Sequence, residues 1–126
     1  MEKVIIITHG NYGEEVLKSV EMIAGKQDNA YAFSINEDTN INDIKKEVKN
    51  LIEDLTEIDT YIFVDIYGGS PFNCAISFLS NPRVKVISGF NMPMILEFFV
   101  NRNRDIETMI EDSRKSITYV NDEMKG

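Results

Sequence analysis

Apolar runs alternate with helically spaced apolar stripes along the chain, and this pattern predicts strands separated by helices. The first run, residues 4–7, consists of β-branched residues between a charged N-terminus and Gly10, as in a strand buried on both faces of a sheet. Further strands are predicted at residues 30–35, 61–66 and 84–88, with a short final strand at residues 117–120.

Helices are predicted between these strands. The cleanest stripe covers residues 41–55, where apolar residues recur every three or four positions among lysines and acids. Ser70 followed by Pro71 fits a helix N-cap with proline in the first helical position. Other helices are predicted at residues 14–24 (ending at Gly25), 72–79, 93–99 and from 106 onward (with Asp105 as the cap).

Strands that alternate with helices predict an α/β fold, with a doubly wound, mainly parallel sheet of four to five strands and helices on both faces. The length of 126 residues suits one compact domain, expected to span residues 1–126. The carboxyl ends of parallel strands meet at one edge of the sheet, where such folds bind their ligands. His9, Asp65, Ser70 and Asn91 follow the first, third and fourth strands and are therefore expected to converge there.

Composition and charge restrict the class of protein. The net charge of −8 argues against nucleic-acid binding, because no basic face is available to neutralise phosphates. The apolar run after Lys3 is too short for a signal peptide and no segment approaches a membrane span, which predicts a cytoplasmic protein. The single Cys74 excludes an internal disulfide and, with one histidine, offers too few ligands for a usual zinc site, so no metal or cofactor is expected. Cys74 is predicted to be a small core residue on a helix.

His9 is the only histidine of the chain and ends the first predicted strand. A nearby carboxylate such as that of Asp65 would accept a hydrogen bond from one ring nitrogen and leave the lone pair of the other nitrogen free. Gly68, Gly69 and Ser70 lead into a helix whose first N–H groups favour an anion. A nucleophilic imidazole that faces such an anion site is suited to accepting and passing on a phosphoryl group.

Each of these residues also has a purely structural interpretation. Asp65 can cap a turn at a strand end, and Gly68 and Gly69 can form that turn. Ser70 is more readily a helix cap than a nucleophile, because the helix amides would engage its oxygen. Asn91 is predicted as a turn residue. The functional hypothesis therefore rests on the convergence of these residues at one edge.

Three segments also carry a resemblance to a known family: Thr8-His9-Gly10, Val64-Asp65 followed by Gly-Gly-Ser-Pro-Phe-Asn at residues 68–73, and Gly-Phe-Asn-Met-Pro-Met at residues 89–94. They resemble the enzyme IIA component of the mannose, fructose and sorbose family of the sugar phosphotransferase system (PTS), over nearly the whole chain. The resemblance implies that His9 accepts a phosphoryl group from the carrier HPr and passes it to a IIB component. It also implies that Asp65 orients the ring and that Ser70, with the adjacent backbone amides, helps to hold the phosphoryl group.

The resemblance further implies partners and assembly. Members of the family are typically homodimers with a C-terminal strand that can be exchanged between subunits, and residues 117–120 are the candidate for it. Apolar residues near Phe98 and Phe99 are expected in the core or at a subunit contact. Any IIB domain would be a separate polypeptide, and the membrane components IIC and IID would be met only indirectly. Tyr67 departs from relatives that carry tryptophan at the rim of the site. The sugar is left open.

Three alternatives stay open from the sequence. One is a IIA-like phosphotransfer subunit of a dihydroxyacetone kinase. Another is a receiver-like regulator phosphorylated on Asp65, although the acids that would hold magnesium after the first strand are replaced by Thr8-His9. The third is a hydrolase with Ser70, His9 and Asp65 as a triad, which Pro71 weakens because the pattern G-x-S-x-G is absent.

Overall fold

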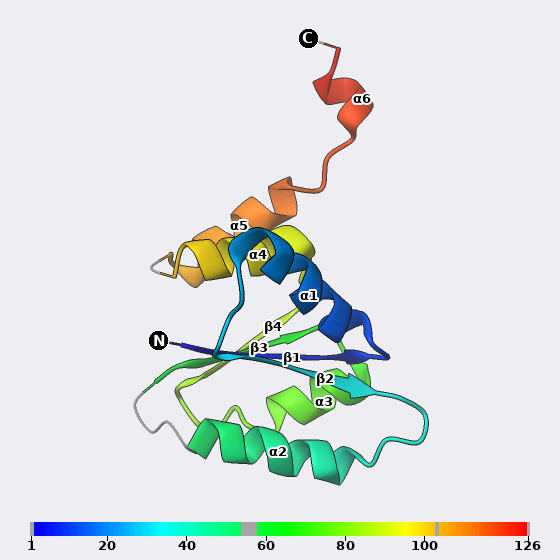
Figure 1. Cartoon of the computed structure of the whole chain (residues 1–126), viewed down its shortest axis with the longest axis vertical. Helices are drawn as coiled ribbons and strands as arrows, with labels where there is room; N and C mark the ends of the chain where they lie inside the picture. The colour runs from blue at the N-terminus through cyan, green and yellow to red at the C-terminus, as the bar shows by residue number, and fades with distance from the viewer. Residues whose placement is uncertain (1, 54–57, 103, 126) are drawn as a thin grey trace.

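The computed structural model describes residues 2–53, 58–102 and 104–125. Its centre is an all-parallel sheet of four strands in the order β2-β1-β3-β4 (Figure 1). The strands are β1 (Lys3–His9), β2 (Ala30–Ile35), β3 (Thr60–Val64) and β4 (Val84–Ser88). The predicted α/β class and parallel doubly wound sheet are confirmed.

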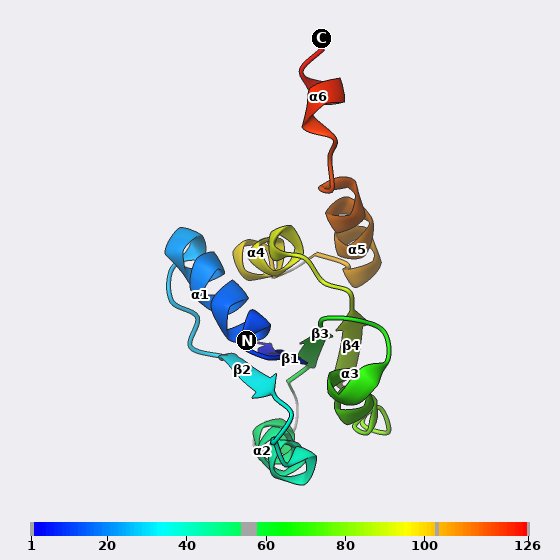
Figure 2. The ribbon, with the colours of Figure 1, turned by 90° about the vertical axis from the view of Figure 1, so that its right-hand side faces the viewer.

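Helices cover both faces of the sheet, as the alternating pattern predicts. Figures 1 and 2 show α1 (Tyr12–Ala24), α4 (Met92–Val100) and α5 (Ile106–Lys115) on one face. The opposite face carries α2 (Ile41–Glu53) and α3 (Gly69–Ile76). A short helix, α6 (Val120–Glu123), lies beyond α5. No helix within the described residues combines the length and the apolarity that crossing a membrane requires.

The run of β-branched residues in β1 supplies both halves of the core. Alternate side chains of a strand point to opposite faces, so Val4 and Ile6 pack beneath α1 and α4, whereas Ile5 and Ile7 pack toward α2 and α3. All four are fully buried. Burial of each of these side chains stabilises the folded state by about 1.5–3 kcal/mol. The strand β1 is therefore a rigid support for the residues that follow it.

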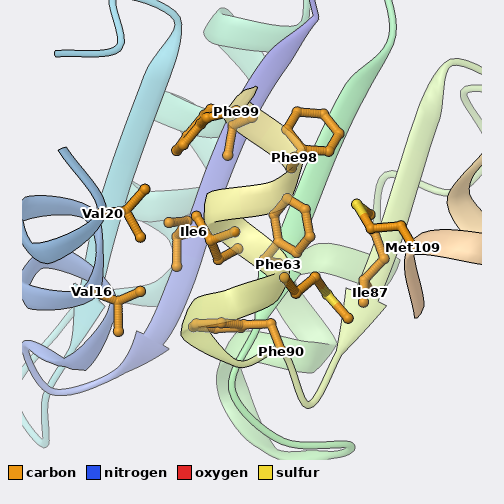
Figure 3. Packing of buried hydrophobic residues seen from close by; sticks show 12 residues of the cluster. Ile6, Val16, Val20, Phe63, Ile87, Phe90, Phe98, Phe99 and Met109 are labelled. Atoms are coloured by element: carbon orange, nitrogen blue, oxygen red, sulfur yellow. The ribbon is translucent and has the colours of Figure 1, made fainter. Parts of the chain in front are cut away.

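Aromatic rings fill the space between the sheet and α4 (Figure 3). The ring of Phe63 lies edge-on to those of Phe90 and Phe98, with centroids 6.3 and 5.7 Å apart. Edge-to-face packing of this kind adds about 0.5–1.5 kcal/mol per pair beyond area burial. Phe98 and Phe99 are both buried within this subunit, so of the two roles expected for them the structure assigns the core.

The prediction of a final strand at residues 117–120 is wrong for the single chain. Residues 117–119 are irregular and α6 follows, with Ile117 and Tyr119 exposed. Figures 1 and 2 show this segment extending away from the body of the domain. A strand needs backbone partners on a neighbouring strand, and among the described residues this segment takes part in no strand pairing.

Smaller differences concern element ends. The third strand stops at Val64 instead of residue 66, because the Asp65 carboxylate accepts hydrogen bonds at the strand end. The helix α3 begins at Gly69 with Gly68 as N-cap, so Ser70 lies inside its first turn and the predicted Ser70 cap is wrong. Leu55, predicted in the second helix, lies outside the described residues.

Other local predictions are confirmed. Gly25 ends α1 with φ of 85°, and Asp105 caps α5 by accepting a hydrogen bond from the Thr108 N–H. Cys74 is a buried helix residue, and burial raises the pKa of its thiol. The prediction of Asn91 as a turn residue is wrong, because Asn91 is instead the N-cap of α4 and accepts from the Met94 N–H.

Candidate functional site

The site lies at the carboxyl ends of two adjacent strands, β1 and β3, whose following helices lie on opposite faces of the sheet. The strands β1 and β3 are adjacent, but the chain leaves β1 for α1 on one face and leaves β3 for α3 on the other (Figure 2). This arrangement opens a crevice at the carboxyl ends of the strands, the usual ligand position in open α/β sheets. His9 is the last residue of β1, and Asp65 directly follows β3.

The His9 ring is held by the Asp65 carboxylate. His9 Nδ1 lies 2.8 Å from Asp65 Oδ2, and the His9 backbone N–H donates to the same oxygen at 2.9 Å. The Ile66 N–H donates to the other oxygen, Oδ1, at 3.1 Å. Because a carboxylate only accepts, Nδ1 carries a proton in this pair and the lone pair of a neutral ring lies on Nε2. The His9 side chain is 51% exposed and that of Asp65 only 12%, so His9 is the accessible member.

These contacts set the charge state of Asp65. Partial burial by itself raises the pKa of the carboxyl group. Hydrogen bonds from the His9 backbone and ring, together with the attraction to a protonated His9, outweigh that effect and place the pKa below its usual value of 3.8. Asp65 is therefore a carboxylate throughout the neutral range.

The lowered pKa predicts how stability depends on pH. A carboxyl group whose pKa is lower in the folded state stabilises that state fully above its unfolded pKa, and the contribution is lost as the pH falls through the folded pKa. The stability advantage of the wild type over Asp65→Asn should thus be fully present above pH 3.8 and shrink as the pH falls below that value. Urea unfolding of both proteins at a series of pH values measures this difference. An advantage that stayed constant or grew as the pH fell below 3.8 would contradict the assignment.

The close approach of Gly69 to His9 defines the second wall of the site. A Cβ atom added at Gly69 would lie 3.3 Å from His9 Cε1 and 3.5 Å from Nε2, and the residue has φ of 87°. This conformation is unfavourable for any residue with a Cβ, by about 1–2 kcal/mol. Glycine at this position therefore lets the start of α3 come within contact distance of the ring.

We expect Gly69→Ala to impair any reaction at His9 by displacing the ring or the start of α3. Gly25→Ala is a matched control, because Gly25 has nearly the same φ of 85° but open space around the added Cβ. Both variants should lose comparable stability in thermal unfolding, whereas chemical phosphorylation of the ring should slow several-fold only in Gly69→Ala. Equal rates in the two variants would show that the contact with His9 has no consequence.

A pocket of about 510 Å³ opens beside the ring. His9 and Ser70 both line it, and its far wall comes from the loop between β2 and α2. The Gly10 N–H donates to the Ile35 carbonyl at 2.9 Å, which fixes this loop against the turn after β1. The complete lining consists of His9, Gly10, Ile35, Asn36, Glu37, Thr39, Ile41 and Ser70.

The buried Thr8 hydroxyl secures the turn after His9 from below. Thr8 Oγ1 accepts from the Gly13 N–H at 2.8 Å and donates to the Gly10 carbonyl at 3.3 Å. The first contact satisfies an N–H at the start of α1 that has no intrahelical acceptor. The backbone on both sides of His9 is thus tied to the sheet and to α1.

The structure brings together His9, Asp65, Gly69 and Ser70 but not all of the residues expected to converge. Asn91 Nδ2 donates to the Ser113 carbonyl at 3.0 Å, and Asn91 lines a separate hollow under α5. Sequence reasoning missed the pocket wall at residues 35–41. The signal was available, because this polar loop follows the carboxyl end of β2 at the same edge of the sheet.

The arrangement offers a nucleophile, an orienting carboxylate and an anion-favouring helix start. Among the described residues, no group of three or more His, Cys, Asp or Glu side chains is arranged to hold a metal ion. The chemistry available to the residues present is attack by Nε2 on an electrophile whose negative charge the α3 N-terminus stabilises.

Comparison with known proteins connects this geometry to a family. The family model described as "PTS system fructose IIA component" matches residues 3–117. The fructose-specific EIIA component of Bacillus subtilis is 32% identical over 99 residues, covering 77% of this chain and 68% of that protein. The mannose-specific EIIAB component of Escherichia coli is 32% identical over 104 residues, and the match spans 81% of this chain but only 32% of that longer protein.

Solved structures agree with this match. The EIIA component of Streptococcus agalactiae superposes with a TM-score of 0.86 at 26% identity, covering 96% of this chain and 98% of that one. The overall fold described above is thus shared with a PTS EIIA protein. On the sequence match and the common fold, the chain belongs to the PTS fructose IIA component family, the EIIA phosphotransferase components of sugar uptake.

Proposed function

We propose that this protein is a phosphohistidine carrier that accepts a phosphoryl group from HPr on Nε2 of His9 and passes it to a IIB component. The observation that supports this most strongly is the contact of His9 Nδ1 with Asp65 Oδ2 at 2.8 Å in a ring that is otherwise half exposed. It leaves one nitrogen available, in the tautomer that a nucleophile needs.

In the proposed step, the lone pair of His9 Nε2 attacks phosphorus in line with the P–N bond of phosphorylated HPr. The new bond forms at Nε2, the bond to the donor nitrogen breaks, and its electron pair returns to the donor ring. The proton on His9 Nδ1 stays in place, and Asp65 stabilises the positive charge that the phosphorylated ring acquires. Transfer to IIB is the same step in reverse, with the IIB nucleophile as acceptor.

The phosphoryl oxygens would be held at the start of α3. We assign this role to the turn at Gly68 and Gly69 and to Ser70, which lines the pocket together with His9. The first N–H groups of a helix lack intrahelical acceptors, and the helix dipole places partial positive charge there. No metal or cofactor enters this step.

The geometry favours this function over the alternatives. A receiver would need Asp65 as the accessible nucleophile, but its carboxylate accepts three hydrogen bonds and is largely covered. A hydrolase triad would need a bond between Ser70 and His9, and none is formed among the described residues, where Asp65 is the hydrogen-bond partner of His9. The named relatives are PTS components, which favours sugar uptake over a dihydroxyacetone kinase subunit.

The test is incubation of the purified protein with phosphoenolpyruvate, enzyme I and HPr, followed by intact-mass analysis. We expect a gain of one phosphoryl group that is lost in acid and kept in base, and that is transferred onward when a IIB component is added. No gain in mass with active HPr would contradict the proposal. As a partner of HPr the protein would act in the cytoplasm and meet the IIC and IID components only through IIB.

We also propose that the protein is a homodimer. The strand β4 lies at the edge of the sheet with one side unpaired among the described residues. The segment that starts at residue 117 leaves the body with apolar side chains exposed, namely Ile117, Tyr119, Val120 and Met124. The apolar extension of one copy of the chain can therefore pack against the exposed edge of β4 in a second copy.

Removal of residues 117–126 should therefore convert a dimer to a monomer. The mass measured by sedimentation is expected to be twice 14.4 kDa for the full chain. For the shortened chain it is expected to equal the mass of one monomer. A chain that keeps residues 117–122 is the control for loss of the terminus alone and should remain dimeric. A monomeric full chain, or a dimer that survives the larger deletion, would contradict the proposal.

A further inference from the structure

We propose that the groove between α2 and α3, which we call the lysine groove, binds a short acidic segment of a partner protein. One wall consists of three lysines of α2, namely Lys45, Lys46 and Lys49. The other wall consists of Ser77 and Phe78 at the end of α3. The segment places carboxylates against the lysines and an apolar side chain against Phe78. This inference concerns a second surface and does not depend on the proposed phosphoryl transfer.

The lysine groove consists of two adjoining hollows on the face of the sheet that carries α2 and α3 (Figures 1 and 2). Their volumes are about 470 and 350 Å³, and Lys49, Ser77 and Phe78 line both of them. Together they follow α2 from Asn42 to Glu53. At about 1.5 Å per residue this part of the helix is roughly 16 Å long, the length of about five residues of an extended segment.

The groove is separate from the pocket beside His9. None of the residues that line the two hollows also lines that pocket. Helix α2 begins at Ile41, which does line the pocket, and the three lysines lie roughly one to two turns farther along the helix. A segment in the groove therefore leaves the His9 pocket free.

The groove is basic although the chain as a whole has a net charge of −8. Residues 66–96, which include α3 and β4, contain no aspartate or glutamate. A helix turns by about 100° per residue, so Asp43 and Glu47, each two positions from Lys45, point away from the groove and line neither hollow. Anions are therefore attracted locally to a protein whose overall charge repels them.

The lysines are available to a partner. Among the described residues, Lys45 and Lys46 take part in no ion pair. Lys49 Nζ lies 3.9 Å from Glu53 Oε1, and the two side chains are 64% and 62% exposed. Exposed pairs of this kind contribute little to stability, so a carboxylate of the partner can displace Glu53 at small cost.

Phe78 supplies an apolar contact that is already in place. The side chain is partly buried and packs against the core beneath α2 and α3, yet it lines both hollows. A side chain that is fixed by packing loses little conformational freedom on binding. An apolar residue between the acidic residues of the segment therefore adds affinity and fixes its position along the groove.

The composition of the walls favours a peptide segment over other anions. The groove ends at the carboxyl end of α3, where the helix dipole places partial negative charge, and this disfavours a compact phosphate group. An extended anionic surface such as nucleic acid would meet the acidic remainder of the chain and be repelled by it. A short segment avoids both effects, because its separate carboxylates each meet one lysine and charges beyond about 8 Å are largely screened at physiological salt.

The test is NMR titration of isotope-labelled protein with synthetic peptides. The probe is GEDLEDG, in which a leucine stands between two acidic pairs, whereas GQNLQNG lacks the charges and GEDSEDG lacks the leucine. With the probe, amide signals of α2 and of residues 77–81 should shift, and those of His9 and Asp65 should not. The affinity should be at least about tenfold weaker for GQNLQNG and about threefold to tenfold weaker for GEDSEDG.

Variants of the protein locate the contact. The variant that combines Lys45→Gln, Lys46→Gln and Lys49→Gln should bind the probe roughly thirtyfold more weakly, at about threefold per lysine. The matched control removes the same charge from three exposed lysines elsewhere, by Lys18→Gln, Lys26→Gln and Lys115→Gln. Its affinity should stay within about twofold of the wild-type value, because those lysines are screened from the groove. Thermal unfolding of both variants checks that each keeps its fold.

Several outcomes would overturn the inference. Equal weakening in the two triple variants would show that the probe responds to overall charge and not to the groove. Equal affinities for GEDLEDG and GQNLQNG would show that the groove does not select acidic residues. Inorganic triphosphate that binds in the groove as tightly as the probe would identify a site for small anions instead of a docking site. Groove signals that do not shift with millimolar probe would contradict the proposal directly.

Discussion

Replacing His9 with alanine should abolish phosphoryl transfer completely. His9 is the only histidine, so no other imidazole of the chain can take over. The side chain is half exposed and lies on β1 with its backbone anchored by Asp65, so its loss should leave the fold intact. Intact-mass analysis after incubation with phosphoenolpyruvate, enzyme I and HPr should show a phosphoryl group on the wild type and none on His9→Ala.

The stability of the label in acid and base identifies the acceptor independently. Phosphohistidine is lost in acid and kept in base, whereas a phosphate ester on serine survives acid and an acyl phosphate on Asp65 is lost in base. Ser70→Ala is the matched control and should still be phosphorylated, at a reduced rate. A label that persists on His9→Ala would move the chemistry to Asp65 or Ser70 and refute the mechanism proposed above.

Replacing Asp65 with asparagine should slow phosphoryl transfer by roughly 100-fold, the scale on which a positioned proton-holding group contributes to a reaction. The amide is neutral, so it cannot stabilise the positive charge of the phosphorylated ring. Its NH₂ group can also face Nδ1 and favour the tautomer with the proton on Nε2, which removes the nucleophilic lone pair. Single-turnover kinetics with phosphorylated HPr and with phosphoramidate should show the same loss.

Asp105→Asn is a suitable control for this substitution. Asp105 caps α5 through its side chain, and asparagine caps helices about as well. Its transfer rate should equal that of the wild type. A wild-type rate in Asp65→Asn would remove Asp65 from the mechanism, and a loss confined to HPr would assign it to docking instead of to the ring.

The sequence predicted most of the architecture because local and tertiary preferences agree there. The strands at residues 30–35 and 84–88 are found at their predicted bounds, since short runs bounded by polar or turn residues leave little freedom of register. The final strand at 117–120 failed for the opposite reason. Its β-favouring residues specify a strand only if a neighbouring strand pairs with them, and no strand of the described part of the chain does so.

The candidate site was predictable in its residues but not in its contacts. His9 and Asp65 could be paired from strand ends alone, because parallel strands bring their carboxyl ends to one edge. The same argument placed Asn91 with them, although its side chain instead caps α4 and reaches Ser113. Which strand lies next to which decides such cases, and the spacing of residues along a chain does not contain that order.

By itself, the sequence determined the α/β class, the parallel sheet, the single imidazole and the glycine-rich start of a helix after the third strand. These follow from periodicity, from turn chemistry and from residue identity, all of which are local. Only the tertiary structure decided the order β2-β1-β3-β4, the 2.8 Å contact of His9 with Asp65, the approach of Gly69 to the ring and the pocket wall that includes Glu37. Distances between segments that are 50 or more residues apart depend on how both faces of the sheet pack, and that packing is a property of the whole core.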